Sequence, residues 1–285
     1  MRPTPGESAP AATGDALSCA ADHESGGARG AQRGGAIEQA SVEHMRFRVV
    51  TYNMRKGKGI KRSRPALEHI CRELGRLEPA VLLCQEVFHD SGSAGVSQSA
   101  DMADALELLH RYEPNAAYRK GHHGNASFSS FPVVRHFNRD ISTNAIERRG
   151  VLYFRLRLDH ANELHVFNTH FGLSQRQRLR QAEHVGHIIR AEVPPSDPVI
   201  LAGDFNDWTG QVDQRIAQAA EVENAMLALA IAERRTWSTR RPIFALDRIY
   251  YRNLHLAEVK VHRHRPWDEL SDHFPVEAIF EAGER

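Results

Sequence analysis

The sequence has few cysteines, few aromatic residues, no long hydrophobic run and almost no net charge. Its three cysteines (Cys19, Cys71 and Cys84) are too few for a disulfide framework, and none stands in a Cys-x-x-Cys spacing. No window approaches the ~18 apolar residues that a membrane-spanning helix needs. Lysine plus arginine (37) balance aspartate plus glutamate (36), so no overall field directs the chain to nucleic acid or membrane. A membrane-embedded, collagen-like or mainly disordered chain is thereby excluded.

Residues 1–44 differ from the rest of the chain because they contain no aromatic residue and few large aliphatic ones. Such a segment cannot bury enough apolar surface to offset its ordering entropy, and it lacks the apolar run of a signal peptide. We expect a disordered tail here, or an upstream mis-start before Met45, followed by one domain over 45–285. The few cysteines, of which Cys71 and Cys84 have apolar neighbours typical of core positions, predict a reduced, cytoplasmic protein.

From Phe47 onward, short apolar runs alternate with helical patterns, which indicates an α/β domain. Apolar spacing predicts helices at 66–77, around Met102 to Leu109, at 179–189 and at 226–231. Strands are predicted from apolar, β-rich runs at 47–52, 80–84, 151–158, 163–169, 198–202, 247–251 and 275–280.

Four of the predicted strands end in polar side chains that can bind ligands. The first leads into Asn53, the second into Glu86, the fourth into His170, and the fifth into Asp204 and Asn206. In α/β sheets, ligands bind at the carboxyl ends of strands. Each of these residues alone is also typical of ordinary turn chemistry. Their recurrence favours a common site.

A metal ion is suggested by the types of side chain at these strand ends. Near the carboxyl end of the chain, Asp272 and His273 place a carboxylate and an imidazole on opposite sides of an extended backbone. The oxygen-rich set predicts Mg²⁺ or Mn²⁺. With 17 histidines zinc stays open, although no histidines have the HExxH spacing of zinc proteases.

Eight short motifs in order make the chain resemble the endonuclease/exonuclease/phosphatase superfamily, with its deoxyribonuclease-I-like fold, and most closely a small bacterial branch of metal-dependent hydrolases. The resemblance implies a four-layer α/β sandwich, in which two mixed sheets pack face to face with helices outside. The motifs are TYN (51–53), QE (85–86), GNA (124–126), RG (149–150), NTH (168–170), GDFND (203–207), LDRIY (246–250) and SDHFP (271–275).

The resemblance also implies which residues bind the metal ion and the substrate. Glu86 matches the principal ligand of a divalent ion, Mg²⁺ or Mn²⁺, with Asn53 beside it and Asp272 nearby. Asn125 and Arg149 match positions that line the substrate pocket in many members.

Catalytic roles follow from the same resemblance. His273 matches the catalytic histidine and Asp247 the carboxylate that orients it. Asp204 and Asn206 match the pair that positions or activates the attacking water, and His170 matches a donor to a phosphate oxygen. Whether Asp204 or His273 accepts the water's proton stays open.

The expected activity is hydrolysis of phosphate esters, most of all by a nuclease-like phosphodiesterase. A phospholipid phosphodiesterase and a small-molecule phosphomonoesterase are alternatives, so the partner is a nucleic acid, a phospholipid headgroup or a small phosphate ester. A catalytically silent binding module with the same fold is the contrasting class. We expect a monomer without stable membrane insertion.

Overall fold

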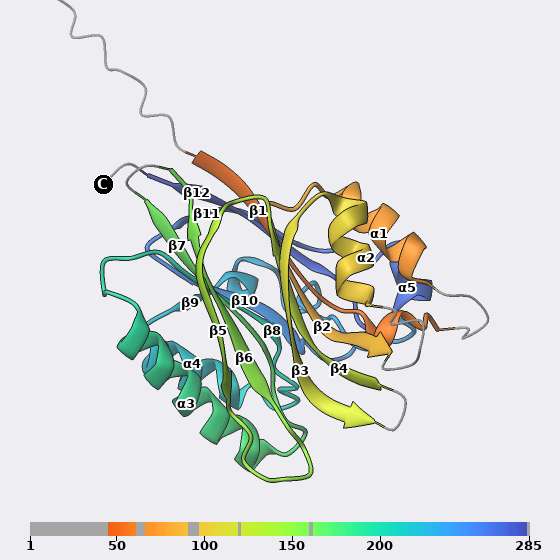
Figure 1. The fold of residues 1–285 in the computed structure, drawn as a ribbon. Helices are drawn as coiled ribbons and strands as arrows, with labels where there is room; N and C mark the ends of the chain where they lie inside the picture. Colours follow the sequence, from red (N-terminus) through yellow and green to blue (C-terminus); the bar gives the residue numbers. More distant parts are fainter. Residues whose placement is uncertain (1–44, 61–65, 91–96, 119–120, 160–161, 284–285) are drawn as a thin grey trace, which may run out of the picture. The chain divides into compact units, whose positions relative to one another are not determined.

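The computed structural model describes residues 45–60, 66–90, 97–118, 121–159 and 162–283. The tail predicted at 1–44 lies outside these residues. Within them, twelve strands form two six-stranded sheets (Figure 1). In spatial order, the first sheet consists of β11 (His255–Val261), β12 (Val276–Ala282), β1 (Met45–Asn53), β2 (Val81–Asp90), β4 (Gly121–Ser129) and β3 (Leu109–Tyr118). The second consists of β5 (Val133–Asp140), β6 (Gly150–Arg157), β7 (Glu163–His170), β8 (Val199–Asp204), β10 (Asp247–Arg252) and β9 (Glu223–Asn224).

Both sheets mix parallel and antiparallel neighbours. In the first, β1 is parallel to β2 and antiparallel to β12. In the second, β7 is parallel to β8, which is antiparallel to β10. The helices are α1 (Leu67–Gly75), α2 (Gln98–Leu106), α3 (Gln175–Glu192), α4 (Gln211–Ala220) and α5 (Trp267–Leu270), with 3-10 turns η1 (Arg55–Gly57) and η2 (Ala225–Ala228).

The strands bury both of their faces because each sheet lies between two apolar layers. Along β1, Val49 packs between the two sheets, whereas Val50 packs on the opposite face against the helices. The same alternation places Ile200 of β8 between the sheets and Leu201 against α3 and α4. Successive side chains of a strand point to opposite faces, so near-continuous apolar runs are what such buried strands require.

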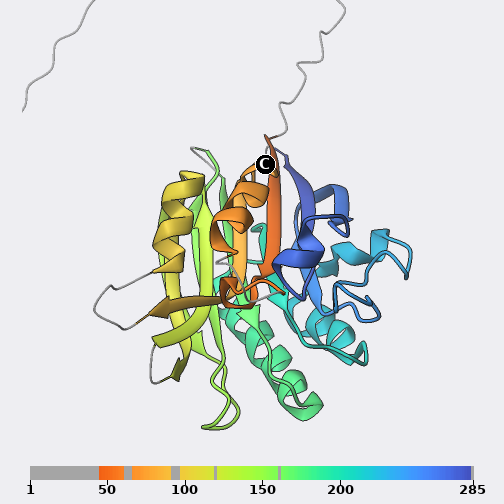
Figure 2. The ribbon, with the colours of Figure 1, turned by 90° about the vertical axis from the view of Figure 1, so that its right-hand side faces the viewer.

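The helices form the two outer layers. Buried residues of α1 and α2 pack on the first sheet, and those of α3 and α4 pack on the second. Figure 2 faces the first of these sides, with α1 and α2 (orange and yellow) in front of the strands. The predicted four-layer sandwich is therefore confirmed. Among the described residues, no helix combines the length and apolar character needed to cross a bilayer.

The seven strand predictions are confirmed, but the helix prediction at 226–231 is wrong. Only the short turn η2 forms there, and the chain continues irregularly. Leu109, assigned to the second helix, begins β3 instead. Five strands, β3, β4, β5, β9 and β11, were not predicted. Polar residues interrupt the apolar pattern of the first three and of β11, and β9 is only two residues long.

Candidate active site

Three predicted site residues lie side by side at the ends of three neighbouring strands of the second sheet. His170 ends β7, Asp204 ends β8 and Asp247 begins β10. The strand register pairs Asp204 with His170 on one side and with Asp247 on the other. Regular pairing of three adjacent strands thus brings together residues that are 77 positions apart in the sequence (247 − 170).

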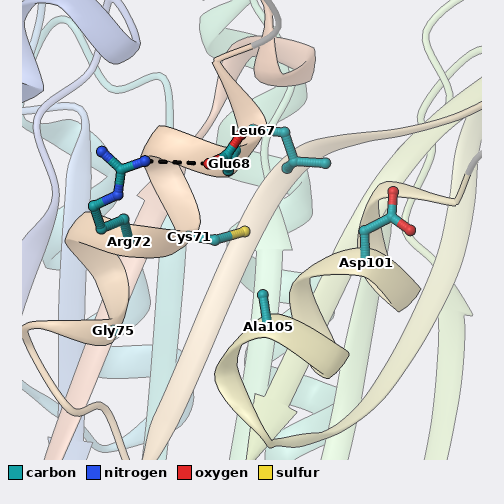
Figure 3. Close-up of a pocket in the computed structure, with 7 residues that line it drawn as sticks. All are labelled: Leu67, Glu68, Cys71, Arg72, Gly75, Asp101 and Ala105. Atoms are coloured by element: carbon teal, nitrogen blue, oxygen red, sulfur yellow. Dashed lines mark hydrogen bonds and ion pairs between the residues drawn. The ribbon is translucent and has the colours of Figure 1, made fainter.

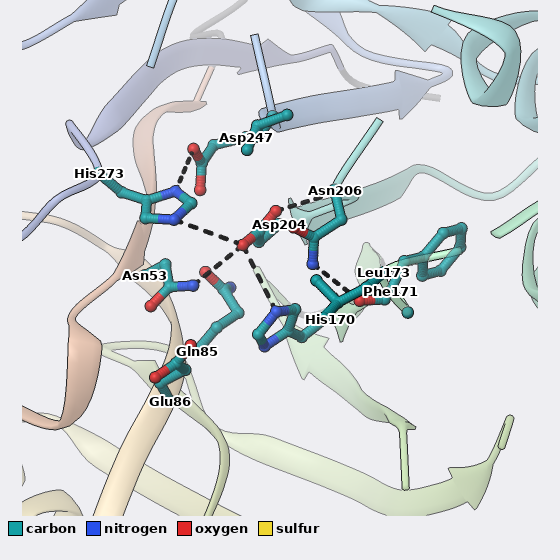
Figure 4. A network of polar contacts seen from close by, with 12 residues as sticks. Asn53, Gln85, Glu86, His170, Phe171, Leu173, Asp204, Asn206, Asp247 and His273 are labelled. Atoms are coloured by element: carbon teal, nitrogen blue, oxygen red, sulfur yellow. Dashed lines mark hydrogen bonds and ion pairs between the residues drawn. The ribbon is translucent and has the colours of Figure 1, made fainter. Parts of the chain in front are cut away.

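The carboxylate of Asp204 is the centre of a buried polar cluster (Figure 4). Its Oδ1 accepts a hydrogen bond from the backbone N–H of Asn206 at 2.9 Å. Its Oδ2 accepts one from Nδ2 of Asn53 at 3.0 Å. The Nε2 atoms of His170 and His273 lie 3.5 Å and 3.7 Å from the same oxygen. Five of the predicted residues are therefore in direct contact.

His273 is held between two carboxylates. Its Nδ1 lies 2.9 Å from Oδ2 of Asp247, and its Nε2 faces Asp204. Both carboxylates are almost fully buried. A carboxylate on Nδ1 fixes the orientation of an imidazole and leaves Nε2 for chemistry. The predicted role of Asp247 as the orienting carboxylate is compatible with this geometry.

Burial and neighbouring charges shift the pKa values in this cluster. Burial raises the pKa of Asp204 to about 6, against the positive charge of His273. Burial alone would lower the pKa of His273, but the charges of Asp247 and Asp204 outweigh it and raise the pKa to about 10. Burial and the positive charge of Arg149 hold the pKa of His170 well below its ordinary value. The pKa values of the two histidines beside Asp204 are therefore shifted in opposite directions.

The first sheet contributes Asn53 and Glu86 to the same region. Asn53 ends β1 and pairs with Gln85 in the strand register. The register of β2 against β4 shifts between Cys84 and Val87, so Glu86 lies in a bulge with a left-handed backbone (φ 54°). Bulges re-aim side chains and are common beside active sites. Here the bulge interrupts the alternation of β2 at the residue predicted to bind metal.

Two predicted metal ligands, Glu86 and Asp272, are paired with basic residues. Oε2 of Glu86 lies 3.1 Å from Nζ of Lys56, and Oδ2 of Asp272 lies 3.7 Å from Nε of Arg55. Burial opposes ionisation of Glu86, but the positive charges of Lys56, a nearby histidine and His273 together lower its pKa. The influence of His273 places Glu86 within the electrostatic reach of the Asp204 cluster.

Asn125 and Arg149 lie next to this cluster but outside its direct contacts. The Nδ2 of Asn125 donates to the backbone oxygen of Gly150 at 3.1 Å. Among the described residues, the buried Oδ1 of Asn125 has no hydrogen-bond partner. Arg149 donates to the backbone oxygen of Phe171 and pairs with Glu147 at 2.8 Å. To bind substrate as predicted, the guanidinium of Arg149 would have to leave or share its ion pair with Glu147.

Sequence reasoning missed the amides that join the two sheets. Gln85 Nε2 donates to Oδ1 of Asn168 at 2.8 Å. Asn168, on β7, donates in turn to the backbone oxygens of Cys84 and Ala126, at 3.1 Å and 2.9 Å. Gln85 lies in the motif QE and Asn168 in the motif NTH, and these motifs were the sign in the sequence that could have identified them. The two amides fix the relative placement of the two halves of the site.

A second missed contact supports the loop that carries Asn206. The next residue, Asp207, accepts from Arg248 of β10 at 3.1 Å and from the backbone N–H of Val212, at the start of α4, at 3.0 Å. Arg248 also lies 3.3 Å from Asp213. These buried charges tie the end of β8 to β10, so the motifs GDFND and LDRIY are joined by more than strand pairing.

The donor set fits a hard divalent cation. Ligand atoms of Asp204, Asp247 and His273 all lie within 4.8 Å of one another. Oδ1 of Asp247 is buried and has no hydrogen-bond partner within the described part of the chain. Glu86 and Asn53 add a carboxylate and an amide oxygen on the facing sheet. Carboxylate and carbonyl oxygens are the ligands that Mg²⁺ and Mn²⁺ prefer.

A separate groove between α1 and α2 contains none of the predicted site residues (Figure 3). The thiol of Cys71 points into this space. Burial, with the negative charge of Asp101, raises the pKa of Cys71 to about 11, so the thiol stays protonated at neutral pH. A nucleophilic cysteine requires the thiolate. The expectation that Cys71 has a structural role agrees with this environment.

The family model described as the endonuclease/exonuclease/phosphatase family matches residues 50–273, which span the whole polar cluster. The chain belongs to this family. Membership supports a hydrolase of phosphate esters as the general class of activity.

Individual relatives cover most of the chain. The uncharacterized protein YbhP of Escherichia coli (strain K12) is 32% identical over 247 residues, which are 83% of this chain and 97% of YbhP. An endonuclease/exonuclease/phosphatase structure from Beutenbergia cavernae has a TM-score of 0.70 at 19% identity, covering 84% of this chain and 72% of that one. A mannosyl-6-phosphatase from Bacteroides thetaiotaomicron has a TM-score of 0.66 at 19% identity, covering 82% and 99%. At such identities the two structures share the fold with this chain.

Proposed function

We propose that this protein is a divalent-metal-dependent phosphodiesterase in which a nuclease-like site activates water for attack on a phosphodiester. The observation that carries the proposal is the His273–Asp247 pair facing Asp204 across 3.7 Å, with Asn53 bonded to the same carboxylate. Acid–base chemistry on a phosphate ester needs such a converging donor and acceptor.

The proposed metal ligands are Glu86, Asn53 and Asp272, with Mg²⁺ or Mn²⁺ as the ion. The alternative set of Asp204, Asp247 and His273 would leave the histidine unable to serve as a proton donor. When bound, the ion supplies Lewis-acid stabilisation of the charge that develops on the phosphate oxygens.

The protein's own groups carry the proton transfers in this proposal. Burial and the nearby carboxylate of Asp247 raise the pKa of Asp204 to about 6, which suits this carboxylate to accept the proton of the attacking water. His273 is oriented by Asp247 to donate from Nε2 to a phosphate oxygen or to the leaving group. His170 and Asn206 orient the oxygens of the phosphate.

A phospholipid phosphodiesterase is the second candidate, and exposed apolar side chains favour it. Ile146 and Leu173 are 98% and 62% exposed. Their loops are joined through Glu147, whose carboxylate accepts from the backbone of Leu173 and pairs with Arg149 beside the site. Apolar loop tips next to a phosphate site suit a lipid surface. In this case Ile146→Asp would reduce hydrolysis of phospholipid vesicles while leaving a soluble diester unaffected.

The test is hydrolysis of bis(4-nitrophenyl) phosphate with and without Mg²⁺ or Mn²⁺. We expect Glu86→Gln to lose about 100-fold or more in rate, because metal-dependent charge stabilisation is worth several kcal/mol. Glu68→Gln, at a 90%-exposed carboxylate on α1, is the matched control. Plasmid DNA, RNA, phospholipid vesicles and small phosphate monoesters then separate the substrate classes. Hydrolysis that persists in Glu86→Gln contradicts the proposed site, and no hydrolysis of any substrate favours a silent binding module.

A further inference from the structure

The turn that follows β1 has an unusual backbone. Arg55, Lys56 and Gly57 have φ angles of 47°, 60° and 62°, all in the left-handed region. Glycine adopts this region freely, but for other L-residues it costs about 1–2 kcal/mol each. Two consecutive charged residues in this conformation need strong external support, and such strain clusters at functional sites.

Hydrogen bonds from neighbouring elements hold this turn in place. Oδ1 of Asn53 accepts from the backbone N–H of Arg55 at 3.1 Å. Nε2 of Gln98, on α2, donates to the backbone oxygen of Lys56 at 2.9 Å, while its Oε1 accepts from Phe88 of β2 at 2.8 Å. The turn is therefore fastened to β1, β2 and α2, and the direction of the Lys56 side chain is set by these bonds.

The lysine is aimed at the proposed metal site. Its Nζ lies 3.1 Å from Oε2 of Glu86, and the two side chains are only 25% and 22% exposed. Glu86 is itself held in a left-handed conformation, so both partners of this ion pair have a constrained backbone. A partly dehydrated pair is stronger than a surface pair, for which the median contribution is about 0–1 kcal/mol.

Lys56 also influences two buried imidazoles, those of His123 and His170. Burial, followed by the positive charge of Lys56, lowers the pKa of His123 to about 4. The same charge contributes to the low pKa of His170, after burial and Arg149. Of these two imidazoles, that of His170 belongs to the residues proposed to orient a phosphate oxygen.

We propose that Lys56 is a substrate-binding residue whose ammonium and a divalent cation compete for the carboxylate of Glu86. When the cation engages Glu86, the ammonium binds a non-bridging oxygen of the substrate phosphate. This inference rests on the proposed metal-ligand role of Glu86. An ammonium on a flexible stem suits the exchange, because it can leave one anion for another without rearranging the turn.

The test measures metal binding without substrate, in the full-length protein. Mn²⁺ is titrated by calorimetry, and binding is followed by loss of the free-ion signal in electron paramagnetic resonance. We expect Lys56→Met to bind Mn²⁺ about tenfold more tightly, because a competing positive charge is removed. The same variant should have a KM for bis(4-nitrophenyl) phosphate about tenfold higher. Lys56→Arg keeps the charge and should bind Mn²⁺ within a few-fold of the unmodified protein.

Two further variants keep the result interpretable. Lys58→Met removes the same charge at an exposed position two residues away, and should change neither quantity. Lys56→Asn also removes the ammonium, and asparagine tolerates the left-handed backbone, so it replaces Lys56→Met if that variant does not fold. Unchanged or weaker Mn²⁺ binding in the folded Lys56 variants, or an unchanged KM, overturns the inference. If Mn²⁺ binding is insensitive to Glu86→Gln, it is the proposed metal site that fails.

Discussion

The Nδ1 atom of His273 lies 2.9 Å from Oδ2 of Asp247, and this contact turns Nε2 toward Asp204. The two carboxylates come from adjacent strands, so the ring is positioned by the sheet. A histidine oriented in this way depends on its carboxylate for both direction and charge.

Replacing Asp247 with asparagine should lower the rate of diester hydrolysis by about 10²–10⁴-fold, the range over which a positioned acid or base contributes. Loss of the carboxylate charge should also lower the pKa of His273, which NMR titration of the ring can measure. Asp197→Asn is a matched control, because Asp197 lies 3.3 Å from the imidazole of His165 away from the site. Equal losses in the two variants would show that the effect is structural.

Gly203→Ala should destabilise the protein and displace Asp204. The backbone of Gly203 has φ +148°, and an added Cβ would lie 1.9 Å from the backbone oxygen of Thr169 on β7. We expect a loss of about 3 kcal/mol or more in the free energy of unfolding, measured in urea. In Gly210→Ala the φ is +75°, but a Cβ would meet nothing within 4 Å, so the loss should be about 1–2 kcal/mol. Similar losses of stability in the two variants would mean that the backbone around Gly203 shifts to accommodate the added Cβ.

Asn168→Ala should lower the free energy of unfolding by about 2–4 kcal/mol, because several buried groups lose their partners. Asn168→Asp should lower it further, since a carboxylate cannot donate to the backbone oxygens of Cys84 and Ala126. Urea denaturation measures the free energy of unfolding of both variants and so shows which is less stable. An aspartate variant as stable as the alanine variant would contradict the donor role of this amide.

The stability contribution of Glu277 should depend on pH. Burial opposes its ionisation, but the hydrogen bond from His262 and the charges of His262 and Arg48 lower its pKa from 4.5. A lowered carboxyl pKa adds stability above the unfolded value, and that stability is lost as pH falls through the folded value. Glu277→Gln should therefore be less stable by about 1–3 kcal/mol at pH 7, with the difference shrinking below pH about 4.5. Glu281→Gln, on the same strand, is the control, and a pH-independent difference in thermal unfolding would refute the assignment.

The sequence predicted the buried strands and their polar ends better than the elements at the edges of the sheets. Runs such as Val199–Ala202 are apolar because both faces of the strand are buried in apolar layers. Polar residues follow where the strand leaves these layers. Edge strand β5 (Val133–Asp140) alternates imperfectly and is half exposed, so its pattern resembles that of a loop. The segment from Met226 has helical apolar spacing, but its side chains pack against the strands as an irregular segment instead.

The sequence predicted which residues make up the candidate site better than it predicted the contacts between them. The positions of Asp204, Asp247 and His273 follow from motifs and strand ends. The pairing of Lys56 with Glu86 depends on two left-handed backbone segments, which leave no periodic signal in a sequence. The ion pair of Arg149 with Glu147 depends on how a long loop folds back on itself.

The amide of Asn168 reaches from one sheet to the backbone of the other, close beneath the site. The alignment of Glu86 with Asp204 is consequently a property of how the two sheets dock, and the surface loops have little part in it. We expect substitutions at exposed positions such as Ile146 to change the choice of substrate while leaving the docking of the two sheets intact.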